Sequence, residues 1–138
     1  YGLSNREVRQ KGEKLIKELG LLKQKRKLIS GLPLGIKQKL SFSIAIIHKP
    51  QVVFLDEPTG GVDPVTRRLF WEMIADTAST GITVFVTTHY MDEAEYCDRV
   101  SMMSAGEIKG LDSPENLKTQ FQADSMYEVF LKIAREKA

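Results

Sequence analysis

Disulfide bonds, membrane-spanning segments and a strong charge bias are all missing from this sequence. It contains one cysteine, Cys97, so an intrachain disulfide is excluded and a reducing compartment is the expected setting. No apolar run approaches the roughly 20 residues that a membrane-spanning helix needs. The formal net charge is only +2, which gives no argument for binding nucleic acid or an anionic membrane through the overall field.

What is present is the composition of an ordinary globular domain. The chain has 138 residues, with 42% hydrophobic and 28% charged residues, enough for one domain with a sizeable core. Its first residues, Tyr1, Gly2, Leu3 and Ser4, include neither Met nor a signal-peptide pattern, and we therefore expect the sequence to be part of a longer chain.

The most informative stretch is an apolar run that ends in two carboxylates. In order it comprises Val52, Val53, Phe54, Leu55, Asp56 and Glu57. The run is too short for an isolated helix and rich in β-branched and aromatic residues, which predicts a strand buried on both faces, as in a parallel sheet. Ligands bind at the carboxyl ends of such strands, where one acid can hold Mg²⁺ and the other can orient or deprotonate a water. The alternative interpretation is an ordinary strand that ends in a charged turn.

A second strand is predicted one helix later. Asp63 is suited to cap the intervening helix, with Pro64 at its first position. Residues 82–88 are then predicted to form a second buried strand, which ends at His89. A strand, a helix and a strand in this order predict a right-handed parallel crossover, which would bring His89 to the same edge of the sheet as the two acids.

Other elements are predicted from capping residues and from apolar residues at helical spacing. Helices are expected at residues 4–20, 22–28, 35–48 and 91–96, and in two segments near the carboxyl end, the first opened by Ser113. A third strand is expected at residues 99–103, before a turn at Ala105 and Gly106. Inward-facing positions are expected at Leu40, Ile44 and Ile47, at Leu69, Phe70, Met73, Ile74 and Thr77, and at Met126, Val129, Phe130 and Ile133.

Together these segments resemble the carboxyl-terminal part of an ABC transporter nucleotide-binding domain. Residues 52–57 resemble the Walker B motif with its following glutamate, and Thr88 with His89 resembles the H-loop. Residues 91–99 resemble the segment after the H-loop in the drug-exporting and polyketide-exporting subfamily. The D-loop, usually Ser-Gly-Leu-Asp, is resembled by Gly60, Gly61, Val62 and Asp63.

This resemblance implies an α/β fold over nearly the whole chain. About residues 36–138 would form part of a P-loop NTPase (RecA-like) parallel sheet flanked by helices. About residues 1–35 would form part of the helical subdomain that characterises the family.

The resemblance also implies a role for each motif residue. Asp56 would hold Mg²⁺ through water, and Glu57 would act as the general base or position the attacking water. His89 would contact the γ-phosphate of ATP. Asp63 would act at the interface of a domain dimer.

The family's signature loop, usually Leu-Ser-Gly-Gly-Gln, would fall on Leu32, Pro33, Leu34, Gly35 and Ile36. The basic run at residues 37–40 supports this register, because a similar run follows the motif in the family. Pro33 replaces the serine and has neither hydroxyl nor N–H, while Leu34 replaces the first glycine. Ser30 and Gly31 offer a competing register that would displace the basic run. Similar Leu-Pro-Leu-Gly forms occur in family members that fuse two such domains in one chain.

The family's phosphate-binding loop, Gly-x-x-x-x-Gly-Lys-Ser/Thr, is missing from this sequence. The strand that leads into it, the glutamine loop and the adenine-stacking aromatic are missing too. The family places all of them before the position of Tyr1, so the chain corresponds to about half of a nucleotide-binding domain. We expect residues 1–138 alone to be inactive.

The predicted function is the ATP-binding and ATP-hydrolysing component of an ABC transporter, with an exporter favoured. Its partners would be a second nucleotide-binding domain, as a homodimer or a fused pair, and a transmembrane permease subunit or domain at the cytoplasmic face of the membrane. The alternative is a soluble ABC-type ATPase that acts on nucleic acid or ribosomes; residues 91–99 and the absence of a basic patch favour the transporter, with no nucleic acid as partner. A non-hydrolytic regulatory domain is a third interpretation, which Glu57 and His89 oppose and Pro33 leaves open.

Overall fold

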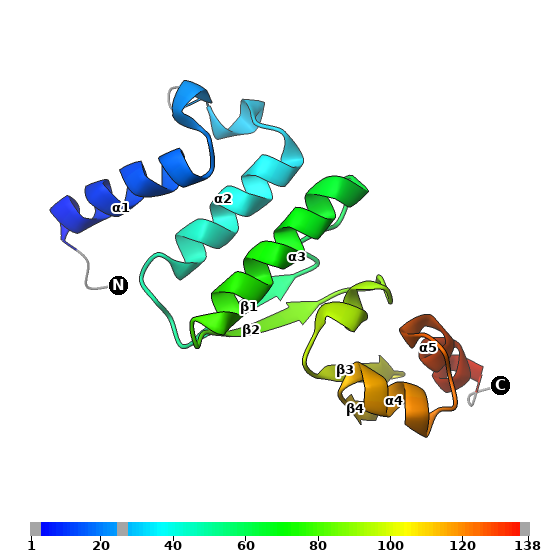
Figure 1. Ribbon diagram of the computed structural model, residues 1–138. Coiled ribbons are helices and arrows are strands. Elements are labelled where there is room, and N and C mark those ends of the chain that lie inside the picture. The colour runs from blue at the N-terminus through cyan, green and yellow to red at the C-terminus, as the bar shows by residue number, and fades with distance from the viewer. Residues whose placement is uncertain (1–3, 25–27, 136–138) are drawn as a thin grey trace. The chain divides into compact units, whose positions relative to one another are not determined.

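The computed structural model describes residues 4–24 and 28–135, which belong to two compact units. The first unit is Tyr1–Thr87 and the second is Thr88–Ala138. Figure 1 shows the helices and strands of both.

The first unit begins with helices. Helix α1 (Asn5–Glu18) starts at a capping box of Ser4 and Glu7, and the Lys11 ammonium donates to the Ile47 carbonyl at 3.0 Å. Two short 3₁₀ turns, η1 (Leu22–Gln24) and η2 (Ile29–Gly31), lead to α2 (Leu34–Ile46). The helix predicted at residues 22–28 is therefore one turn within its first residues, and its residues 25–27 lie outside the described part.

A parallel strand pair follows α2, as the sequence predicts. Strand β1 (Val52–Asp56) pairs in parallel with β2 (Thr83–Thr87), and helix α3 (Pro64–Ser79) connects them. The α3 amino end is capped by Asp63, whose carboxylate accepts from the N–H groups of Val65 and Thr66. This pair and its crossover confirm the predicted α/β class.

Side chains of α2 and α3 form much of the first unit's core. The rings of Phe42 and Phe70 lie 5.5 Å apart, and Trp71 and Ile74 are buried with them. Figure 1 shows α2 and α3 side by side with the β1–β2 pair along α3. Hydrophobic burial of this kind drives the packing of the two helices.

The predictions that the β1 strand is buried on both faces and that residues 82–88 form a buried strand are both wrong. Val53 is buried, but Phe54 is 75% exposed and the neighbouring Phe85 is 53% exposed. Successive side chains of a strand point to opposite faces, and within the described residues α3 packs on β2 without a second helical layer over the Phe54 and Phe85 side chains. The two rings, 5.6 Å apart, contact each other instead.

Two predicted inward positions of these helices are also wrong, because Ile44 and Leu69 are exposed. Trp71, which was not predicted, is buried in their place. Apolar residues lie on more than one side of α3, so periodicity alone did not settle which side faces α2.

The second unit consists of a hairpin and two helices after a short 3₁₀ turn, η3 (Glu93–Tyr96). Strands β3 (Val100–Ser104) and β4 (Glu107–Asp112) pair antiparallel through Ala105 and Gly106, both with positive φ, as two-residue hairpin turns require. Helix α4 (Pro114–Gln120) is capped by Ser113 as predicted, and α5 (Met126–Arg135) follows.

Six buried residues make the core of the second unit: Ala94, Met102, Leu117, Met126, Val129 and Ile133. Three of them belong to the predicted stripe of α5, whereas its fourth member, Phe130, is 37% exposed and that prediction is wrong. Within the part of the chain that the structure describes, no helix has the length and apolar character needed to cross a membrane.

Candidate functional site

Hydrogen bonds join the carboxyl ends of β1 and β2 next to two acidic residues. Asp56 and Thr87 are register partners at the last paired position, and the Thr87 hydroxyl donates to the Asp56 carboxylate. The N–H of Glu57 donates to both the carbonyl and the hydroxyl oxygen of Thr87, at 3.1 Å and 3.2 Å. Both carboxylates are exposed. The pairing therefore fixes the backbone at the strand ends while leaving the acids accessible.

Glu57 has a left-handed backbone with φ of 43°, which is uncommon for a residue with a side chain. Its carbonyl accepts the N–H of Gly60 at 3.1 Å, which closes a turn directly after the strand. The next two residues, Pro58 and Thr59, are buried. Strained backbone of this kind is held in place by its surroundings and is common at functional sites.

The acids fit a divalent cation that is shared with a ligand. Among the described residues there is no group of three or more His, Cys, Asp or Glu side chains that could hold a metal ion. Mg²⁺ commonly binds one or two protein carboxylates together with substrate phosphates, and the exposed Asp56 offers that donor chemistry. The Thr87 hydroxyl would orient Asp56 as a second-layer partner.

The predicted signature loop and D-loop line one pocket. It has a volume of about 240 Å³ and lies between the amino ends of α2 and α3. Its lining comprises Pro33, Leu34, Gly35, Ile36, Lys39, Gly61, Val62, Asp63 and Thr66. The remaining two members of the predicted motifs lie nearby in the chain: Leu32 is buried, and the Gly60 carbonyl accepts from Gln38 Nε2 at 3.4 Å. Segments about 25 residues apart in sequence are thus neighbours in space.

Two glycines at this pocket are required, one for close approach and the other for its backbone conformation. A Cβ at Gly35 would lie 2.4 Å from Thr66 Cγ2, and a Cβ at Gly61 would lie 3.4 Å from Leu34 Cδ2. Gly61 also has φ of +71°, a conformation that side chains disfavour. Hydrogen bonds from the Thr66 hydroxyl and N–H, and from the Val65 N–H, hold the pKa of Asp63 below its ordinary value of 3.8.

His89 belongs to the second unit, two residues beyond the end of β2. It is exposed, and its ring contacts that of Tyr90, with the centroids 4.2 Å apart. The Thr88 hydroxyl before it donates to Glu93 Oε2 at 2.6 Å.

The residues that hold the motif residues in place were not predicted from the sequence. Thr87 could have been predicted as the partner of Asp56, because equal numbers of residues along the two parallel strands place the two opposite each other. Gln38 and Thr66 gave no comparable signal, because their partners come from other helices and loops.

Comparisons with known proteins bear on this arrangement. A family model described as "AAA domain, putative AbiEii toxin, Type IV TA system" matches residues 4–91. The chain is 40% identical over 141 residues to the Escherichia coli (strain K12) protein "Probable multidrug ABC transporter ATP-binding protein YbhF", covering 99% of the chain and 24% of that protein. It is 38% identical over 136 residues to the Homo sapiens protein "Phospholipid-transporting ATPase ABCA3", covering 98% of the chain and 8% of that protein.

A solved structure described as "Structure of ATP binding subunit of ABC transporter" is also similar. It matches with a TM-score of 0.80 at 26% sequence identity, covering 97% of this chain and 57% of that one. The chain therefore spans about a quarter of its Escherichia coli relative and a little over half of the solved subunit.

Proposed function

We propose that this chain binds ATP and takes part in its hydrolysis. It belongs to the AAA-domain family matched over residues 4–91 and to the ATP-binding proteins of ABC transporters. The predicted family and its α/β P-loop NTPase fold are confirmed by the similarity to the Escherichia coli relative and to the solved ATP-binding subunit. Because the chain spans 24% of its Escherichia coli relative, the proposal concerns the intact protein and not residues 1–138 alone.

The observation that carries the proposal is the pairing of the two strand ends. The Glu57 N–H is held by Thr87, and the Glu57 carboxylate is exposed one residue beyond Asp56. A carboxylate on a backbone fixed in this way is suited to orient a water molecule or accept its proton. Asp56 would hold Mg²⁺ through water, and the bound ion would neutralise charge on the phosphates.

His89 is assigned the contact to the terminal phosphate of ATP. An imidazole that follows the carboxyl end of a parallel strand can donate a hydrogen bond to a phosphate oxygen. Its exposed ring, packed beside Tyr90, is accessible for that contact.

The pocket between α2 and α3 supports an interface with a second nucleotide-binding domain. Pro33, Leu34 and Gly35 lie at the amino end of α2, where no side chain caps the helix. A helix amino end attracts phosphate, and we assign this loop to the nucleotide of the partner domain. Asp63, on the opposite wall of the pocket, is assigned to the same interface.

The remaining assignments follow from the relatives. The name of the Escherichia coli relative refers to multidrug transport and that of the human relative to phospholipid transport, and both support an exporter that works with a transmembrane permease. We place the chain at the cytoplasmic face of the membrane, beside that permease.

The decisive variant is Glu57→Gln in the intact protein. The amide keeps the size of the side chain but cannot accept a proton, so steady-state ATP hydrolysis should fall by about 100-fold or more while ATP binding persists. Phosphate release gives the rate, and equilibrium binding of a fluorescent ATP analogue gives the affinity.

Glu72→Gln is the matched control. Glu72 is an exposed carboxylate in the same unit, 3.4 Å from Arg68 Nε, and exposed pairs of this kind contribute little. Its rate should stay within about twofold of the parent. Full hydrolysis by the Glu57 variant would remove the catalytic assignment.

A further inference from the structure

Three hydrogen bonds in the second unit join the residues on either side of His89 to each other and to Glu93. The Thr88 hydroxyl accepts the N–H of Tyr90 at 3.0 Å and donates to Glu93 Oε2 at 2.6 Å. The N–H of Glu93 donates to the Tyr90 carbonyl at 3.1 Å. Thr88 is therefore bonded to the side chain of Glu93, and Tyr90 is bonded to the backbone N–H of Glu93.

The Glu93 side chain is unusual for its burial. Its relative exposure is 0%, whereas His89, four residues earlier, is exposed. A buried carboxylate is costly unless hydrogen bonds compensate, so such groups are found with specific partners. One partner that the structure provides is the hydroxyl of Thr88, which donates to Glu93 Oε2.

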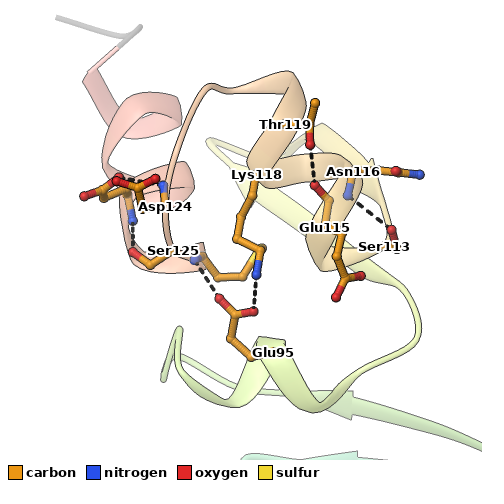
Figure 2. A network of polar contacts seen from close by, with 10 residues as sticks. Glu95, Ser113, Glu115, Asn116, Lys118, Thr119, Asp124 and Ser125 are labelled. Carbon is orange, nitrogen blue, oxygen red and sulfur yellow. Dashed lines mark hydrogen bonds and ion pairs between the residues drawn. The ribbon is translucent and has the colours of Figure 1, made fainter.

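The turn that carries Glu93 is itself fixed to the helices of the unit. Glu95, on the same 3₁₀ turn, accepts from Lys118 Nζ at 2.7 Å, as Figure 2 shows. It also accepts from the Met126 N–H at 3.1 Å. Ala94 between them is buried in the core. The turn thus links α4 and α5 on one side to the His89 segment on the other.

We propose that Thr88 and Glu93 are positioning residues for His89, which they hold in a single backbone conformation for its contact with the terminal phosphate. This inference rests on the proposed role of His89. Neither side chain is assigned a contact with the nucleotide, and both act through the backbone on either side of His89. Misplacement of a reacting or binding group by about 1 Å can reduce a rate by about 100-fold.

The test uses Thr88→Val in the intact protein. Valine keeps the branched shape but removes the hydroxyl that joins Tyr90 to Glu93. We expect kcat to fall by about 10- to 100-fold with a smaller change in KM for ATP, because the contact with His89 matters most when the phosphate is transferred. Thr88→Ser restores the hydroxyl and should return kcat to within about threefold of the parent.

Thr119→Val is the matched control. Its hydroxyl donates to the Glu115 carbonyl at 3.0 Å on α4 (Figure 2), so the variant also removes one threonine hydrogen bond from the second unit. It should leave kcat within about twofold. The melting temperature of every variant is recorded, and an equal fall in kcat for Thr88→Val and its control would show a general structural effect and overturn the inference.

A double variant separates this inference from the proposed function. In a His89→Ala background, Thr88→Val should lower kcat by less than about twofold further, because two residues that act through one contact are not additive. A full additional loss would overturn the positioning role and leave the ATPase assignment intact. If His89→Ala itself keeps full kcat while Glu57→Gln loses it, the role of His89 fails and this inference fails with it.

Discussion

Gly35 of α2 and Thr66 of α3 approach so closely that a Cβ on Gly35 would lie 2.4 Å from Thr66 Cγ2. Thr66 cannot move aside freely, because its χ1 is restricted and its hydroxyl is bonded to Asp63. This close approach lies between the predicted signature loop and the start of α3, and both residues line the pocket between them.

Gly35→Ala should therefore destabilise the first unit by about 1–3 kcal/mol, the usual cost of overpacking. Adding Thr66→Ser removes the opposing methyl group but keeps the hydroxyl, and should restore part of the loss. Gly12→Ala is the control, because a Cβ at Gly12 would meet nothing within 4 Å and alanine should stabilise α1 by about 0.5–1 kcal/mol. Denaturant unfolding followed by Trp71 fluorescence reports on this unit; equal effects of the two alanine variants would contradict the steric explanation.

The double substitution Pro33→Ser with Leu34→Gly should strengthen the ATP site that uses this loop. Serine adds a hydroxyl and glycine removes bulk next to the phosphate, and one hydrogen bond to a charged group contributes about 1.5–3 kcal/mol. ATP affinity or turnover of the intact protein should rise accordingly. Ser30→Ala tests the competing register and should have no effect on ATP affinity. A loss in Ser30→Ala without a gain in the double variant would move the loop to Ser30 and Gly31.

Residues 1–138 alone should show no ATP hydrolysis above background and no measurable ATP binding at ordinary concentrations. The sequence has no phosphate-binding loop, and the lysine and backbone N–H groups of such a loop provide most of the contacts that bind ATP. Self-association is also expected, because Phe54 and Phe85 expose an apolar sheet face and both strands have an unpaired edge among the described residues. Size-exclusion chromatography and a Mg-ATP titration measure the two properties. A monomer that binds ATP with micromolar affinity would contradict both.

Cys97 should react slowly with thiol reagents in the folded chain. Burial, together with the negative charges of Asp98 and Glu93, raises its pKa from 9.0 to about 11. Since the thiolate is the reactive form, labelling at pH 8 should be about 100-fold slower than in denaturant. The raised pKa also means that this thiol's contribution to stability is complete below pH 9 and is lost as the pH rises through about 11. A labelling ratio below about threefold would indicate an accessible thiol.

Local sequence alone was enough to locate most elements. Capping residues such as Ser4, Asp63 and Ser113 act on the helix they begin, so their effect can be read from neighbouring residues. The strand, helix and strand order likewise predicted the parallel pairing of β1 with β2, because the crossover has one strongly favoured hand. The family was predicted from the order and spacing of the motifs, which can also be seen in the sequence alone.

Burial and side-chain neighbours were decided only by the tertiary structure. The sequence of β1 is apolar throughout, yet Val53 is buried and Phe54 is exposed, since burial depends on which face another element covers. Periodicity did not tell Trp71 from Leu69 on α3 for the same reason. The contacts of Thr66 with Gly35 and of Thr88 with Glu93 depend on how chain segments pack and turn in three dimensions, and the spacing of motif residues carries no information about them.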